Sequence, residues 1–163
     1  MQKPDRGKRH VEFYSDGVPD STHRDRLATA QVFLTHISRG DVAEAIDVLS
    51  ENVTYRAQGA NALAGLFTGR DAVIRHLTDL VERTKGTFEA FKWDDWLIGE
   101  HHVAGLSSIH ALSHGRSYKG RSLTVVGFNM ADEIEHITVF FEDQGALDRF
   151  IGPYPNPNPN PNS

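Results

Sequence analysis

The chain has 163 residues, no cysteine and a formal net charge of −5. A chain of this length fits one domain that can bury a hydrophobic core without covalent cross-links. The lack of cysteine excludes disulfides and thiolate chemistry and favours a reducing, cytoplasmic location. The acidic balance is not typical of nucleic-acid binding, and no apolar run has the length of a membrane span. We therefore expect a soluble cytoplasmic protein with no nucleic-acid or membrane partner.

Composition divides the chain into three parts. Residues 1–22 are polar and lack hydrophobic periodicity, which predicts a flexible N-terminal extension. Residues 153–163 alternate proline with asparagine, and proline has no backbone N–H to donate, which predicts a disordered tail. The periodic apolar patterns lie between these segments, so residues 23–152 are expected to form the folded domain.

Three segments have apolar residues at helical spacing and are separated by glycine or capping residues. The second and third segments begin with the capping-box patterns Asp41/Glu44 and Thr68/Asp71. The predicted helices cover approximately residues 27–39, 41–49 and 68–85.

The second half of the chain changes to segments rich in β-branched and aromatic residues. Short turn-forming stretches separate these segments, and short connections between strands indicate antiparallel hairpins. The predicted strands are 88–98, 103–112, 118–130 and 134–141. Helices followed by a meander of strands indicate an α+β fold with the sheet curled around the helices.

Four motifs occur in a recognisable order: the strand 53–59, the loop Leu63-Ala64-Gly65, the helix start 69–73 and the closing segment 146–150. Together they resemble the SnoaL-like branch of the nuclear transport factor 2-like superfamily, which includes polyketide cyclases, ketosteroid isomerases and limonene epoxide hydrolases. The resemblance implies a cone-shaped, cystatin-like α+β fold with three N-terminal helices packed in a curled antiparallel sheet. It also implies a cavity inside the cone.

The resemblance does not extend to the catalytic residues of the two well-understood branches. Phe33, Ala57 and Thr124 occupy the positions of the tyrosine, the base and the acid of ketosteroid isomerases. Tyr55 matches the tyrosine of epoxide hydrolases, but Ala57, Ser107, Ile109 and Val139 replace their other polar residues. Proton abstraction beside a ketone needs a base and hydrogen-bond donors, so the steroid isomerase mechanism is not expected.

Residues two apart on a strand share a face, and this rule predicts the wall of the cavity. On the third predicted strand, Trp93 and Asp95 point inward unless a bulge exchanges them for Asp94 and Trp96. The expected substrate-binding residues are Phe33, Ala57, Trp93, Ser107, Ile109, Thr124, Val126, Ile137, Val139 and Phe141.

Three side chains are candidates for chemistry. Asp95 is the inward carboxylate of this register, and burial would raise its pKa and suit it to acid or base catalysis. The alternative is that Asp95 only bonds the backbone on a solvated surface. Tyr55 either donates a hydrogen bond to a substrate oxygen or packs as part of the wall. His110 becomes a candidate only if its strand shifts by one residue.

No histidine spacing fits a metal site, and neither a metal nor a cofactor is expected. Apolar residues recur on the predicted outer face of the sheet, at Leu112, Leu123, Val125, Ile134 and Phe140. A solvated face is not normally so apolar, which predicts a homodimer formed through this face.

The sequence favours a cofactor-independent cyclase or isomerase that acts on a hydrophobic, oxygenated small molecule, as in polyketide-type specialised metabolism. Catalysis in such a cavity can depend largely on holding the substrate in a folded conformer. Two alternatives stay open: a small-molecule binding protein without catalysis, and an association domain that uses the same fold.

Overall fold

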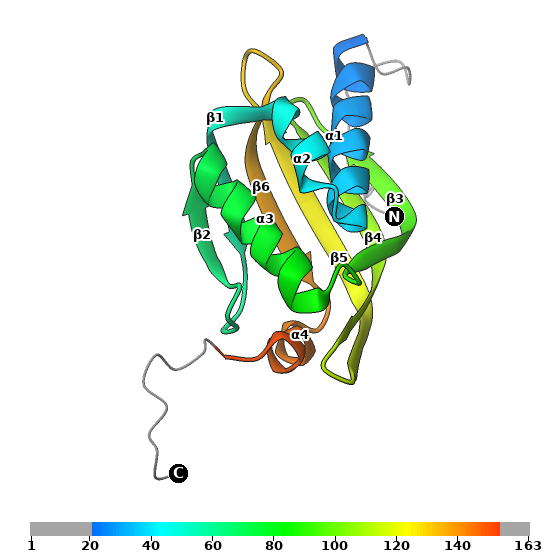
Figure 1. The fold of residues 1–163 in the computed structure, drawn as a ribbon. Coiled ribbons are helices and arrows are strands. Elements are labelled where there is room, and N and C mark those ends of the chain that lie inside the picture. Colours follow the sequence, from blue (N-terminus) through cyan, green and yellow to red (C-terminus); the bar gives the residue numbers. More distant parts are fainter. Residues whose placement is uncertain (1–20, 154–163) are drawn as a thin grey trace, which may run out of the picture.

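The computed structural model describes residues 21–153 and contains four α-helices and one six-stranded sheet (Figure 1). Residues 1–20 and 154–163, which include most of the predicted extension and tail, lie outside the described residues. Within the described part of the chain, no helix is both long and apolar enough to cross a bilayer.

The first helix, α1 (Ser21–Arg39), ends where Gly40 adopts a positive φ of 80°. The second predicted helix is much shorter than expected. α2 (Val42–Ala45) passes into a 3₁₀ turn (Ile46–Val48), and β1 (Leu49–Ala57) begins at Leu49. Leu49 lies within the predicted second helix (41–49), but in the structure it is fully buried and pairs with Ile134 in the sheet. Tertiary pairing has therefore overridden the local helical pattern.

The expectation of three N-terminal helices is not confirmed. One long helix and one short helix precede β1, and β2 (Gly65–Thr68) separates β1 from α3 (Arg70–Thr84). Neither predicted capping box forms as expected. Asp41 and Gly69 occupy the N-cap positions of α2 and α3, and neither helix has a side-chain cap.

The remaining strands are β3 (Glu89–Ile98), β4 (His102–Ser113), β5 (Arg116–Phe128) and β6 (Ile134–Phe141), all within two residues of the predicted limits. The sheet order is β2-β1-β6-β5-β4-β3. The sheet is not wholly antiparallel, because β6 lies beside β1 and runs parallel to it. This pairing joins the first strand of the chain to the last, so that β1 and β2 belong to the same sheet as the meander β3–β6.

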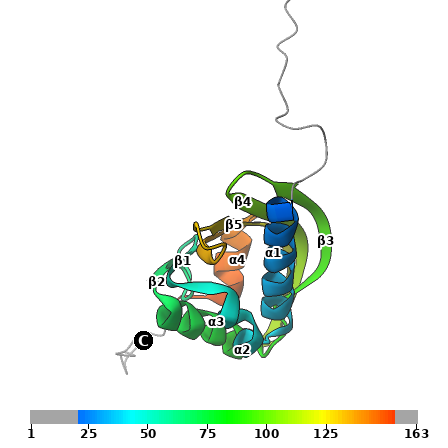
Figure 2. The same cartoon turned by 90° about the horizontal axis from the view of Figure 1, so that it is seen from above.

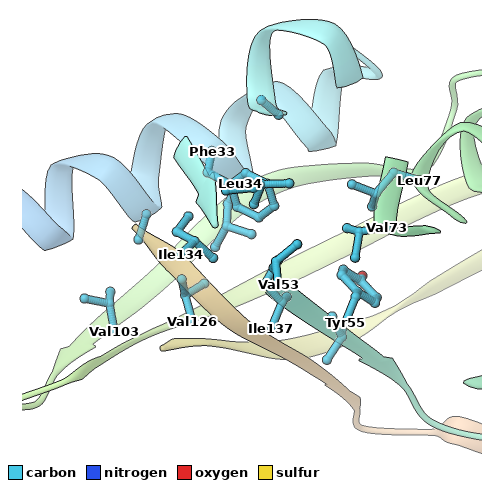
Figure 3. Close-up of a cluster of buried hydrophobic side chains, with 14 of the residues drawn as sticks. Phe33, Leu34, Val53, Tyr55, Val73, Leu77, Val103, Val126, Ile134 and Ile137 are labelled. Atoms are coloured by element: carbon cyan, nitrogen blue, oxygen red, sulfur yellow. The ribbon is translucent and has the colours of Figure 1, made fainter. Parts of the chain in front are cut away.

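The sheet curls around α1 and α3, which both lie on its concave side (Figures 1 and 2). Phe33 from α1 and Leu77 from α3 belong to one core cluster with Val53 of β1 and Ile137 of β6 (Figure 3). Ile134 is also fully buried in this cluster, so its predicted position on the outer face is wrong. The cluster ties both helices to the β1–β6 pair, where burial of apolar area provides the main stabilisation.

Two bulges in β3 change which of its side chains point inward. The second bulge lies between Trp93 and Asp95, and it brings Trp93 and Trp96 together as stacked rings 4.8 Å apart. Both rings lie over Gly105, where a Cβ atom would be 2.8 Å from the Trp93 ring. Asp94 bonds to the Ser108 hydroxyl at 3.0 Å. Strict alternation fails here because the extra residue shifts the register.

A last helix, α4 (Gln144–Ile151), begins with the Asp143 side chain accepting from the Ala146 N–H and lies at one end of the sheet. Its Asp148 carboxylate accepts hydrogen bonds from the Ala60 N–H at 3.0 Å and the Asn61 amide at 2.6 Å. These bonds fix the loop of residues 58–64 to α4.

Replacing Gly59 by alanine should destabilise the protein because an added Cβ would lie 2.2 Å from the Asp148 carboxylate. Such overpacking costs about 1–3 kcal/mol in addition to the backbone strain. Gly86→Ala is the matched control, since Gly86 also has a positive φ but faces open space. Urea unfolding of both variants should show the larger loss of unfolding free energy for Gly59→Ala, and equal losses would contradict the proposed contact.

Candidate active site

An apolar cavity lies between the concave face of the sheet and helices α1, α3 and α4. Eight of the ten predicted substrate-binding residues line it, and Tyr55 lines it as well. The eight are Phe33, Ala57, Trp93, Ser107, Ile109, Thr124, Val139 and Phe141.

Val126 and Ile137 point inward as expected but do not line the cavity. They belong to the cross-strand row that joins Tyr55, Ile137, Val126 and Val103. Both side chains are almost fully buried in the core cluster with the residues of α1 and α3. Tyr55 is the member of this row that lines the cavity, and in the next row Ala57, Val139 and Thr124, which are paired across the sheet, all line it.

Two of the three predicted catalytic residues lie outside the cavity. Asp95 is exposed, and its carboxylate accepts a hydrogen bond from the Trp96 N–H at 2.8 Å. The bulge at Asp94–Asp95 leaves neither carboxylate among the lining residues. His110 lies between Ile109 and Ala111, which are both buried on the inner face, so its side chain belongs to the outer face. The prediction that Asp95 faces the cavity is therefore wrong.

His76 lines the cavity and was not identified from the sequence. It is on α3, is only 4% exposed, and stacks on Phe67 with ring centroids 4.0 Å apart. The Tyr55 ring is tilted against the His76 ring, and their centroids are 4.7 Å apart. A signal was present, because His76 is three residues after Val73 and four before Leu80, on the apolar stripe of the helix.

Burial lowers the pKa of His76 to about 4, with the nearby Asp79 charge acting weakly in the opposite direction. The imidazole is therefore neutral at pH 7. Its Nδ1 atom is enclosed and has no hydrogen-bond partner within residues 21–153. Burial also raises the pKa of the Tyr55 hydroxyl, which stays protonated and able to donate. An unpaired buried nitrogen costs about 1–3 kcal/mol, so this arrangement is not explained by stability.

The floor of the cavity contains a second group of polar side chains. The Ser107 and Ser122 hydroxyls, on paired positions of β4 and β5, share a hydrogen bond of 2.9 Å and are almost fully buried. Thr124 lies two residues from Ser122 and also lines the cavity. Apart from Ser38, the other lining residues of the helices and strands are apolar, so these hydroxyls and the His76–Tyr55 pair mark two separate polar points on those walls.

The loop of residues 58–64 contributes Gln58, Asn61 and Leu63 to the lining of the cavity, and α4, to which this loop is bonded, contributes Leu147 and Ile151. Partial burial alone would raise the pKa of Asp148, but hydrogen bonds from Asn61, Gln144 and the Ala60 N–H together lower it. Asp148 is therefore ionised at neutral pH and keeps the loop attached to the helix. Its role here is structural.

Within residues 21–153, no three histidine or carboxylate side chains come together as a metal-binding group.

Comparison with solved structures shows the nuclear transport factor 2-like, or cystatin-like, fold. Bal32a, from a soil-derived mobile gene cassette, is 21% identical, with a TM-score of 0.75, and the match covers 80% of this chain and 99% of Bal32a. Other matches are described as nuclear transport factor 2-like or cystatin-like proteins. The α+β class and the nuclear transport factor 2-like fold predicted from the sequence motifs are thus confirmed, but the three N-terminal helices are not.

Two further matches have more specific names. A candidate polyketide cyclase from Xanthomonas campestris is 16% identical, with a TM-score of 0.62, over 81% of this chain and 100% of that one. TerC, co-crystallised with polyporic acid, is 11% identical, with a TM-score of 0.67, over 77% and 97%. At such identities these neighbours establish the fold alone. No protein-family model and no curated protein sequence matches the chain.

The buried imidazole should make the protein less stable as pH falls. The folded-state pKa of His76 is about 4 and its ordinary value is 6.5. Between these values the unfolded state binds more protons, so stability present above pH 6.5 is lost as pH falls toward 4, by about 2 kcal/mol between pH 7 and pH 5. His76→Phe keeps an aromatic ring on Phe67 but cannot titrate. Urea unfolding at several pH values should show a smaller loss in the variant, and parallel curves would contradict the assigned pKa.

Proposed function

We propose that the protein is a cofactor-independent cyclase or isomerase that acts on a hydrophobic, oxygenated small molecule in this cavity. The observation that carries the proposal is the neutral His76 imidazole, buried in an apolar cavity beside Tyr55. Perturbed titratable groups in apolar pockets are typical of catalytic sites. The candidate cyclase and the ligand-bound TerC among the structural neighbours are in keeping with this class of ligand.

His76 is placed to accept a proton from a substrate carbon. Because Nδ1 is enclosed, Nε2 is the ring nitrogen left to meet a ligand. When Nδ1 holds the proton, Nε2 has a free lone pair and acts as a general base. It would remove a hydrogen next to a ketone, and the electron pair of the broken C–H bond would move into an enolate.

Tyr55 supplies a hydroxyl that burial keeps protonated, and it lines the same cavity as His76. In an apolar site a hydrogen bond to the developing enolate oxygen is stronger than in water. If the ketone carries a β,γ double bond, the enolate is a dienolate, and it takes the proton back from His76 at the γ carbon while the double bond shifts into conjugation with the carbonyl, which is an isomerisation. Alternatively it attacks a second carbonyl carbon of the same molecule, which closes a ring and leaves an alkoxide that recovers the proton from His76.

Hydrogen exchange provides a test that does not need the natural substrate. Benzylacetone in deuterium oxide should gain deuterium next to its carbonyl faster with the protein than with buffer, as followed by nuclear magnetic resonance. His76→Gln should lower this rate by about 10²-fold, since general base catalysis has that magnitude. Tyr55→Phe should also lower it.

Asp95→Asn and His110→Gln are the matched controls, because neither side chain lines the cavity. Both variants should keep the wild-type exchange rate. Exchange that survives in His76→Gln but is lost in Asp95→Asn would overturn the assignment. Binding of benzylacetone with no exchange in any variant would favour a binding protein without catalysis.

We also propose that two copies associate through the outer face of the sheet. Leu106, Leu123 and Phe140 are cross-strand neighbours there, and Phe140 is 46% exposed. A two-fold axis near Leu123 would place this row against its copy, as isologous dimers require. Asp95 is the cross-strand neighbour of Leu106, and Arg121 is two residues from Leu123 on the same strand. The rim of the proposed interface therefore carries one negative and one positive side chain.

Replacing Val125 and Phe140 together by lysine should produce monomers, since unpaired charges would be buried at the centre of the interface. Sedimentation velocity measures the change directly. Val32→Lys is the control, because Val32 is an exposed apolar residue of α1. A wild-type protein that is monomeric at micromolar concentration would contradict this proposal.

A further inference from the structure

The Ser107–Ser122 pair has hydrogen-bonding capacity that the fold does not use. Two hydroxyls carry two protons, and the bond between them uses only one. No other hydrogen bond of these hydroxyls is present within residues 21–153. Their residues are 1% and 3% exposed and line the cavity, so water from outside does not readily satisfy them.

The surroundings of the pair favour a flat, apolar ligand. Phe141 is the cross-strand neighbour of Ser122, and Trp93 is the cross-strand neighbour of Ser107. All four residues line the cavity. An aromatic ring that lies against these walls would present an oxygen at its edge to the two hydroxyls.

The pair is also well separated from the His76–Tyr55 site. Ser122 is four residues along β5 from Val126, which lies in the same cross-strand row as Tyr55. β6 lies between β1 and β5. Strand geometry therefore separates the Tyr55 and Ser122 backbones by roughly 16 Å. Two polar sites this far apart in one cavity fit an elongated ligand, such as an aromatic ring joined to a short chain.

We propose that Ser107 and Ser122 form a second anchoring site that binds a ring hydroxyl or ring carbonyl of the substrate. The substrate class is then an aromatic or quinone-like ring that carries an oxygen at one end and an enolisable ketone on a short chain at the other. This inference rests on the proposed function, because the ketone end is assigned to His76 and Tyr55. Thr124, next along the same face of β5, would border the ring.

Two probes differ only in the group assigned to this site: benzylacetone and para-hydroxybenzylacetone. The wild-type protein should bind the hydroxylated probe about 3- to 10-fold more tightly, which is the net effect of one hydrogen bond. Isothermal titration calorimetry gives both affinities. Tryptophan fluorescence reports whether the probe binds near Ser107, because Trp93, one of two tryptophans in the chain, is the cross-strand neighbour of Ser107. Binding there should change the emission of Trp93.

The double variant Ser107→Ala/Ser122→Ala should lose this preference, so that the ratio of affinities falls to about one. Removing both partners of a buried hydrogen bond leaves no unpaired group, so the variant should fold, and thermal unfolding checks this. Ser108→Ala is the matched control, since Ser108 is adjacent in sequence but bonds Asp94 on the outer face. It should keep the wild-type ratio.

A preference that persists in the folded double variant would overturn the second anchoring site, as would a wild-type protein with no preference. Failure of the wild-type protein to bind either probe would overturn the proposed ligand class. The proposed catalysis is judged separately, by deuterium exchange into benzylacetone, which lacks the ring hydroxyl. If the double variant loses the affinity ratio but the wild-type protein catalyses no deuterium exchange, the second anchoring site is supported and the catalytic role of His76 is contradicted.

Discussion

The packing of α1 and α3 against one end of the curled sheet determines where the cavity lies. Phe33 and Leu77 pack in one buried cluster with the row of Tyr55, Ile137 and Val126 at that end. In the following rows the helices no longer fill the concave face, and α4 with the loop of residues 58–64 covers the remaining space. The same contacts that stabilise the domain therefore fix the depth, the walls and the cover of the site.

Burying the polar groups inside this cavity costs folding free energy. His76 is held neutral by burial and stacked on Phe67, while the Ser107–Ser122 pair lies in the floor at some distance from it. Each group would be better satisfied in water, and an apolar side chain at position 76 would pack without an unpaired nitrogen. Proteins commonly tolerate such costs at sites of binding or catalysis, and both polar points open on one cavity.

The three functional alternatives depend on different surfaces of the molecule. Catalysis needs a group that exchanges protons inside the cavity, which points to His76. Ligand binding without catalysis needs only the apolar walls and the hydroxyls. Association needs the outer face, where Leu123 and Phe140 lie. The cavity and the outer face are opposite sides of the same strands, so dimerisation and ligand binding are compatible.

The sequence by itself determined the α+β class, the long first helix and the limits of four strands, because periodicity, glycine turns and β-branched runs are local signals. It also placed Ala57, Ser107, Thr124 and Val139 in the cavity wall, since the alternation is uninterrupted around these four positions. Only the tertiary structure decided three further features. The bulge in β3 turned Asp95 outward, the β1–β6 pairing shortened the second helix, and the packing of α3 on β1 and β2 buried His76. Each of these depends on contacts between residues far apart in the chain. The local pattern places His76 on the apolar stripe of its helix, but it does not show which strands that stripe meets.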